Sequence, residues 1–270
     1  MTAPATRLPA GHYPFSGVAR MEWIKLRSLR STWWAVLVLA IGMISLAILV
    51  LRYYPARWAH MSAQDKASFD SVNSGFTGLV LAQLIVGVLG VLAVTSEYSS
   101  GMIRATLTAV PGRRRLLAAK AVVFGGAALL TGEVASVVTF LAGQSVLSSP
   151  VPHATLGQPA VLRAVLLAGG YLCLIGLIGM GIGAIIRHSA GAIVTLIGVV
   201  MVLPAVTLAF PVSVQHAVQR FLPEIIAENS LVSIHPAAYS LSQWAGLGML
   251  GLYAAVLLGA GGWLLGHRDA

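Results

Sequence analysis

The chain has 270 residues, of which 57% are hydrophobic and 9% are charged, and its net charge is +9. Soluble domains are roughly 45–50% apolar and about 25% charged, so this composition excludes an ordinary soluble domain and favours a membrane protein. The basic residues are divided among sites separated by apolar segments, which favours an orientation signal over a nucleic-acid surface. The single cysteine, Cys173, cannot form an intrachain disulfide, and we expect it to pack in the core.

Six apolar segments are long enough to cross a hydrocarbon core about 30 Å thick. The sequence therefore predicts an all-α integral membrane protein with a single six-helix transmembrane domain over residues 33–266. The predicted spans cover about residues 33–51, 75–95, 121–147, 164–186, 189–210 and 244–266.

Most of the 17 Lys and Arg residues lie on one side of these predicted spans. Basic residues collect in cytoplasmic loops, so we expect both termini and the loop between spans two and three to be cytoplasmic. Residues 1–19 are expected to form a flexible cytoplasmic tail, and residues 267–270 a second tail. Between spans five and six, a helical pattern interrupted by Pro223 predicts a helical extracellular cap.

The loop between spans two and three reads SEYSSGMIRATLTAVPGRRRLLAAK. Its spacing allows Met102, Leu107 and Val110 to share one helical face, and Pro111 then breaks the helix. The loop therefore predicts a short cytoplasmic helix, a turn and a basic anchor. Two explanations stay open for the basic anchor, Arg113 to Arg115. It could serve coupling to a partner, or it could only set the orientation of the chain in the membrane. In the second case each arginine would contribute about 1 kcal/mol by binding anionic headgroups.

Residues 20–32, together with the tryptophans that follow, read RMEWIKLRSLRST and WW, which is typical of an amphipathic helix at the membrane surface. We expect the apolar side chains to contact the membrane and the polar ones to face water or anionic lipid. The alternative is an ordinary basic flank of the first span. The residues concerned are Glu22, Trp23, Lys25, Leu26, Arg27 and Arg30.

Glu133 is the one acidic residue well inside a predicted span. Ionised carboxylates are costly in lipid, so such a residue is a candidate for the substrate path. The small and hydroxyl residues of TGEVASVVT would equally suit a structural role at a helix interface. Gly179 and Gly183, like Gly262 and Gly266, have the small-xxx-small spacing of close helix packing.

The loop pattern resembles that of the ABC-2 type family of ABC transporter permeases, and the amphipathic stretch looks like that family's connecting helix. The resemblance implies that a coupling helix in the loop docks on a separate ATPase subunit. The loop residues implied in ATPase coupling are Glu97, Gly101, Met102, Arg104, Thr106, Leu107, Pro111, Arg113, Arg114, Arg115 and Lys120. It further implies an exporter in the plasma (inner) membrane, made of two permease copies, as a homodimer or heterodimer, and two ATPase copies that bind ATP and Mg²⁺.

The sequence contains no phosphate-binding loop, zinc-protease motif or nucleophile elbow. We therefore expect no catalytic residue, metal site or cofactor in this chain, and a hydrophobic or amphipathic substrate moved by alternating access. The alternatives are an intramembrane enzyme, a secondary transporter and a non-transporting membrane anchor of a partner complex. A partner with a phosphate loop encoded next to this chain would favour the ABC exporter.

Overall fold

The computed structural model describes residues 14–102, 112–231 and 240–267, and every regular element in these ranges is helical. The long helices are α1 (Phe15–Ser28), α2 (Arg30–Leu51), α6 (Leu79–Ser99), α8 (Arg113–Ser145), α9 (Pro159–Ile186) and α14 (Gln243–His267). The shorter elements are α3 (Tyr54–Arg57), η1 (Trp58–His60), α4 (Ala63–Ser68), α5 (Ser71–Gly75), η2 (Phe76–Gly78), α10 (Ser189–Ile197), the π-helical turn η3 (Gly198–Val202), α11 (Leu203–Thr207), α12 (Val212–Gln219) and α13 (Pro223–Leu231).

The prediction of six membrane-spanning helices is confirmed, because six helical segments in the described ranges are long and apolar enough to cross a bilayer. The third and fourth helices begin well before their predicted spans. The third starts at Arg113, so the three arginines form its first turn rather than a separate anchor. The fourth starts at Pro159, a residue suited to the first turn of a helix because it has no N–H to leave unpaired.

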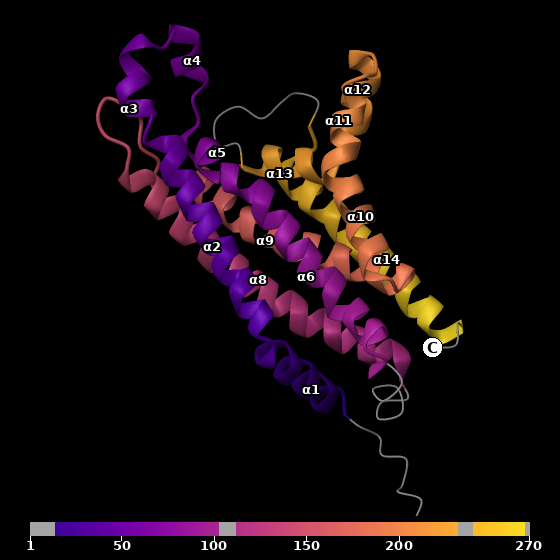
Figure 1. Ribbon diagram of the computed structural model, residues 1–270. Coiled ribbons are helices and arrows are strands. Elements are labelled where there is room, and N and C mark those ends of the chain that lie inside the picture. The colour runs from indigo at the N-terminus through magenta and orange to yellow at the C-terminus, as the bar shows by residue number, and fades with distance from the viewer. Residues whose placement is uncertain (1–13, 103–111, 232–239, 268–270) are drawn as a thin grey trace, which may run out of the picture.

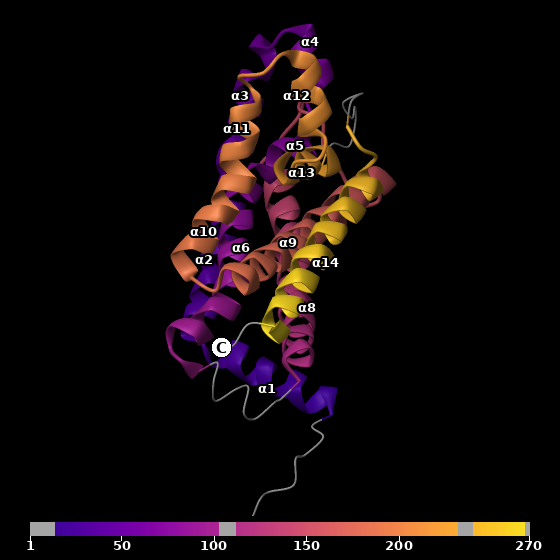
Figure 2. The same cartoon turned by 90° about the vertical axis from the view of Figure 1, so that its right-hand side faces the viewer.

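Helix α9 is the centre of the bundle, with α6, α8 and α14 packed around it (Figures 1 and 2). It is the most buried of the six spans, whereas α2, α8 and α14 expose large apolar side chains such as Leu37, Val122 and Val256. An exposed apolar surface of this extent suits contact with lipid.

Glycines allow α6 and α9 to approach until their backbones touch. A Cβ atom at Gly90 would lie 1.9 Å from the carbonyl oxygen of Gly176, and one at Gly179 would lie 2.2 Å from that of Gly87. Gly183 also approaches the α6 backbone, at Val91, as expected for the Gly179 and Gly183 pair. In the last span the close contact belongs instead to Gly261, against Ala184 of α9, while Gly266 has open space around it.

The fifth span changes its helical form midway, from α10 through η3 to α11. Pro204 lacks an N–H and its ring would clash with the carbonyl of Val200, and the wider π-helical turn just before it accommodates both effects. After this span, α12 and α13 form a helical segment separated at Pro223. Helix α13 packs on α9 and α14, with Ile226 against Gly246.

The two ends of the bundle differ. We use "the α1 end" for the end that holds α1, the last turn of α6, the first turns of α8 and the last turn of α14 (Figure 1). Helix α1 lies across this end, whereas α3, α4 and α12 lie at the opposite end (Figures 1 and 2). An extended residue, Leu29, separates α1 from α2, and the Trp33 indole donates a hydrogen bond to the carbonyl of Arg27 across this corner at 3.0 Å.

Candidate functional site at the α1 end

Helix α1 is fixed to the bundle by a small apolar cluster with the start of α8. Val18 is buried against Leu116 and Ala119, one and two turns into α8. Glu22, one helical turn after Val18, shares the same face and is therefore directed toward the bundle rather than toward water. Trp23 and Ile24 are exposed instead. The burial of Glu22 differs from the expectation that the polar side chains of this helix face water or anionic lipid.

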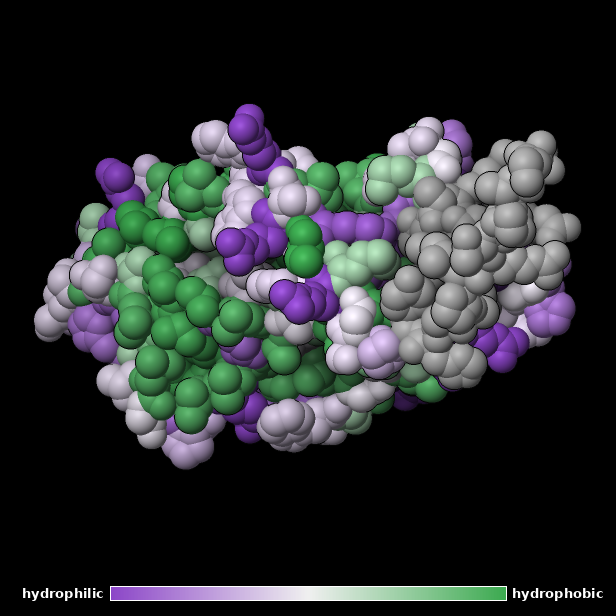
Figure 3. All heavy atoms as spheres, turned by 90° about the horizontal axis from the view of Figure 1, so that it is seen from below, coloured by the Kyte–Doolittle hydropathy of each residue, from purple (hydrophilic) through white to green (hydrophobic). Residues whose placement is uncertain are grey.

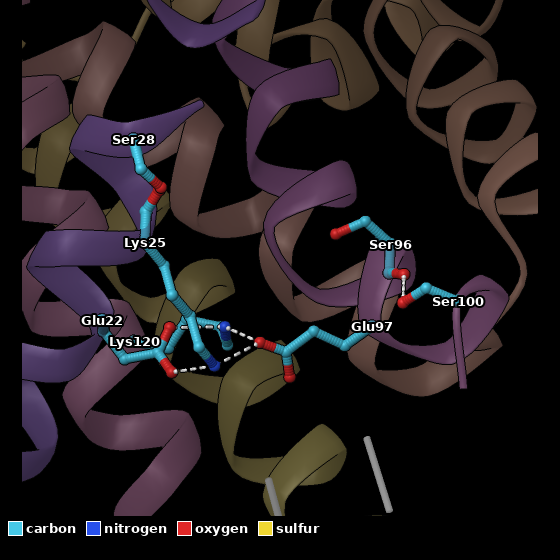
Figure 4. Close-up of polar contacts among 7 residues, drawn as sticks. All are labelled: Glu22, Lys25, Ser28, Ser96, Glu97, Ser100 and Lys120. Carbon is cyan, nitrogen blue, oxygen red and sulfur yellow. Dashed lines mark hydrogen bonds and ion pairs between the residues drawn. The ribbon is translucent and has the colours of Figure 1, made fainter. Parts of the chain in front are cut away.

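Four charged side chains from three helices form a closed ring of ion pairs, shown in Figure 4. The Lys25 ammonium lies 3.0 Å from a carboxylate oxygen of Glu22 and 3.0 Å from one of Glu97. The Lys120 ammonium lies 2.6 Å from the second Glu22 oxygen and 2.9 Å from Glu97. Each cation thus bonds both carboxylates, and we call these four residues the ion quartet.

The quartet is mostly shielded from solvent. The relative exposures are 4% for Glu22, 6% for Glu97 and 7% for Lys120, and the Lys25 side chain is the most accessible at 28%. Burial by itself would lower the pKa of Lys25, but the hydrogen bonds to Glu97 and Glu22 outweigh burial and raise that pKa above its ordinary value. Two carboxylates against two ammonium groups leave no net charge, which is the condition for keeping ions out of water.

The chain between α6 and α8, residues 100–112, is called the connection below. The quartet joins α1 to the two helices that flank this connection. Glu97 stands in the last turn of α6, just before the connection, and Lys120 stands in the second turn of α8, just after it. The 2.9 Å contact between them closes the connection at its base. Glu22 and Lys25 attach that base to α1. The quartet therefore attaches α1 to the two helix ends that flank the connection.

Gly101 ends α6 in the left-handed conformation, with φ of +70°. A residue with a side chain is strained there, so glycine is favoured where the chain leaves the helix. The amide of Gly101 donates a hydrogen bond to the carbonyl of Tyr98 at 3.2 Å. This glycine of the loop pattern therefore has a backbone role in starting the connection.

Two arginines hold the end of α14 beside this site. Arg113 donates a hydrogen bond to the carbonyl of Leu265 at 2.8 Å, and Arg187 donates one to the carbonyl of Leu264 at 3.0 Å. Carbonyls in the last turn of a helix lack helical partners and attract cations. The Arg187 guanidinium also lies 5.4 Å from the ring centre of Tyr98, at the end of α6. The ends of four spans, α6, α8, α9 and α14, thus meet here.

A groove with a volume of about 830 Å³ opens next to the quartet, between α1, α2, α6 and α8. Its walls are mainly apolar side chains of α6, and its rim carries hydroxyl and charged groups. The residues that line it include Leu26, Ser31, Thr32, Ala35, Leu84, Ile85, Val88, Leu92, Val123 and Phe124, with all four members of the quartet. From below, hydrophilic residues gather toward the middle of this face, with a broad hydrophobic surface to their left (Figure 3).

Only some of the remaining predicted coupling residues lie in the ranges that the structure describes. Arg104, Thr106, Leu107 and Pro111, with the body of the expected coupling helix, lie outside the described residues. Met102, Arg114 and Arg115 are exposed around the connection. On the α1 segment, Arg27 and Arg30 are exposed, and Leu26 is half-buried at the groove. Sequence reasoning named all four quartet residues but did not pair them.

Glu133 packs into the contact between α8 and α9. A Cβ atom at Gly169 of α9 would lie 2.5 Å from its carboxyl carbon, so a glycine makes the room it needs. One carboxyl oxygen is buried and has no hydrogen-bond partner among the described residues. Glu133 does not line the groove at the α1 end. Its role in a substrate path stays a prediction, next to the structural alternative.

Cys173 is buried in α9, and its thiol donates a hydrogen bond to the carbonyl of Gly125 in α8 at 3.3 Å. In the ranges that the structure covers, no group of three His, Cys, Asp or Glu side chains could hold a metal ion.

The structure is that of a multi-pass membrane protein with six spans. At one end of the bundle, ion pairs join α1 to the two helices that flank the connection between the second and third spans. Residues 19–205 match the family described as ABC-2 family transporter protein, and the chain belongs to this family. The match begins in α1 and includes the quartet, the first four spans and most of the fifth. A comparison with individually curated proteins gave no match. The chain is thus a transporter permease, the membrane subunit type of its family rather than the ATPase.

Proposed function

We propose that this chain is the membrane half of an ATP-driven exporter. Two copies of it, or one copy and a related permease, would form the pathway, and two copies of a separate ATPase would bind ATP and Mg²⁺. The cargo we propose is hydrophobic or amphipathic, because the bundle offers mainly apolar surface. Both termini and the α1 end would face the cytoplasm.

One observation carries this proposal: the ion quartet joins α1 to both ends of the connection between α6 and α8. An ATPase that pushes on the connection would move α1, α6 and α8 as one body. Because α6 and α8 both pack on α9, this movement would reach the centre of the bundle. A non-transporting anchor would have no use for such a joint.

The docking step can be tested by co-expressing the full chain with a candidate ABC ATPase from the same source and purifying the two proteins together. Met102 is 49% exposed at the start of the connection, and Met102→Asp should weaken co-purification of the two proteins. Val218→Asp changes an exposed valine of α12, at the opposite end of the bundle, and serves as the matched control. Equal recovery of the ATPase with both variants would contradict docking at the connection.

The coupling step needs a separate measurement in proteoliposomes. Breaking the base of the connection with Glu97→Gln should reduce ATP hydrolysis stimulated by transport while the ATPase still co-purifies. Loss of a charge-assisted contact inside a buried network costs about 1.5–3 kcal/mol, so incomplete uncoupling is expected. Unchanged stimulation in a correctly folded Glu97→Gln variant would remove the quartet from the mechanism. ATPase binding without any transport by the wild type would favour the membrane anchor instead.

A further inference from the structure

The groove beside the quartet has a polarity gradient along its length. Its deep part is formed by apolar side chains such as Leu84 and Val88 of α6 and Phe124 of α8. Its rim, near the junction of α1 and α2, carries the hydroxyls of Ser28, Ser31 and Thr32. The ligand that matches this gradient has a long apolar part and one polar end, because burying a polar group deep in the groove would leave it without partners.

The length of the groove is close to that of one membrane leaflet. The residues of α6 that line it run from Leu84 to Glu97, which at 1.5 Å per residue is about 20 Å. Half of a bilayer is about 15 Å of hydrocarbon, or about 20 Å with its headgroup region. The groove therefore extends through one leaflet and reaches the headgroup level at the α1 end. A small compact molecule would leave most of it empty.

Charges at the rim favour an anionic head. The lysines of the quartet are each bonded to two carboxylates, so the quartet as a whole has no charge to offer. Arg27 and Arg30 do not line the groove, but they are exposed beside its rim hydroxyls in sequence, at the last turn of α1 and the first turn of α2. Basic residues near a membrane surface attract anionic headgroups by about 1 kcal/mol each.

We propose that this groove binds one anionic phospholipid, with an acyl chain along α6 and its phosphate at the rim between Arg27 and Arg30. The bound lipid would contact α1, α2, α6 and α8 together. It would therefore favour the arrangement in which α1 is docked on the bundle, to the extent that it binds this arrangement better than others. The inference needs only a chain embedded in a membrane, and it stands apart from ATPase coupling and from the identity of the cargo.

The binding test uses native mass spectrometry of the full chain in detergent, titrated with phosphatidylglycerol. We expect the wild type to retain one tightly bound lipid. Val88→Trp places a large side chain in the groove, whereas Val122→Trp makes the same change at a site on α8 that is 62% exposed. Binding should weaken about tenfold or more with Val88→Trp, because excluding two methylenes already corresponds to this ratio. It should not change with Val122→Trp.

The head preference is tested with phosphatidylcholine carrying the same chains. The wild type should prefer phosphatidylglycerol, and the double variant Arg27→Gln with Arg30→Gln should lose this preference while retaining the lipid. If Val88→Trp does not fold, Ala35→Leu on the opposite wall replaces it, and thermal unfolding decides which variant is folded. Equal lipid binding by a folded groove variant and by Val122→Trp would overturn the proposal. So would a groove variant that changes only the oligomeric state, which would assign the groove to a second copy of the chain.

Discussion

The contact between α6 and α9 in the middle of the bundle and the ion quartet at the α1 end hold helices together by opposite means. Between α6 and α9 the backbones touch at Gly90 and Gly179, and van der Waals packing supplies the attraction. At the α1 end, four charges connect α1, α6 and α8 through long side chains. A backbone contact leaves no room for a side chain between the helices, whereas ion pairs through long side chains span a gap between them. The centre of this permease is thus held by backbone contact, and the charges at its α1 end act across the space between helices.

The largest expected effect comes from adding a single methyl group to the α6 and α9 contact. Gly90→Ala places a Cβ atom 1.9 Å from the Gly176 carbonyl oxygen, and only a shift of a whole helix could relieve the clash. We expect a loss of at least about 3 kcal/mol, the upper part of the range for overpacking, and poor recovery of folded protein. Thermal unfolding in detergent measures the effect.

Gly251→Ala is the matched control for this change. It also adds a methyl group to a glycine of a spanning helix, but no atom apart from those of its own helix backbone and chain neighbours lies within 4 Å of the new Cβ position. Its stability should equal or slightly exceed that of the wild type, since alanine favours helix more than glycine does. Similar losses in the two variants would show that the close contact at Gly90 is not the cause of the loss.

The next effect comes from removing one corner of the quartet. Lys120→Met leaves Glu22 and Glu97 buried and facing each other with Lys25 as the remaining cation. Breaking a buried ion pair by removing one partner costs about 3–5 kcal/mol. The double variant Lys120→Met with Glu97→Met keeps the charges balanced and should recover much of this loss. Additive losses in the double-mutant cycle would contradict a coupled quartet.

A smaller effect should follow alkaline pH through Lys25. Its pKa is raised in the folded chain, so its contribution to stability is complete below the ordinary lysine pKa and is lost as the pH rises through the raised value. The difference in unfolding free energy between the wild type and Lys25→Gln should therefore be constant at lower pH and shrink above pH about 10.5. A difference that stays constant across this range would show that Lys25 acts by packing alone.

The smallest expected effect concerns the end of α14. Arg187→Ala removes a hydrogen bond to the Leu264 carbonyl and the contact with Tyr98. A cation at a helix C-terminus contributes about 0.3–1 kcal/mol, so global stability should change little. Hydrogen exchange in the last turn of α14 should rise, while exchange in α9 stays as in the wild type. Faster exchange throughout α9 would instead show that this arginine supports the centre of the bundle.

The six spans could be predicted from sequence because each depends only on a long apolar run. The ion pairs of the quartet could not be predicted, because Glu22, Glu97 and Lys120 lie on three helices that are far apart in sequence. Only Lys25 is near Glu22 in sequence. One signal was present: Glu22 and Lys25 have the spacing of a helical ion pair, and Val18 with Glu22 marks the buried face of α1. The amphipathic pattern of residues 20–32 placed Glu22 and Lys25 toward water or anionic lipid, because charged side chains usually face water.

The ring arrangement of the quartet makes its four ion pairs depend on one another. Every corner contacts both of its oppositely charged neighbours, so pulling one residue away breaks two contacts at once and leaves an uncompensated charge behind. Such a joint gives way as a unit rather than one contact at a time, so α1 would separate from the ends of α6 and α8 together or not at all.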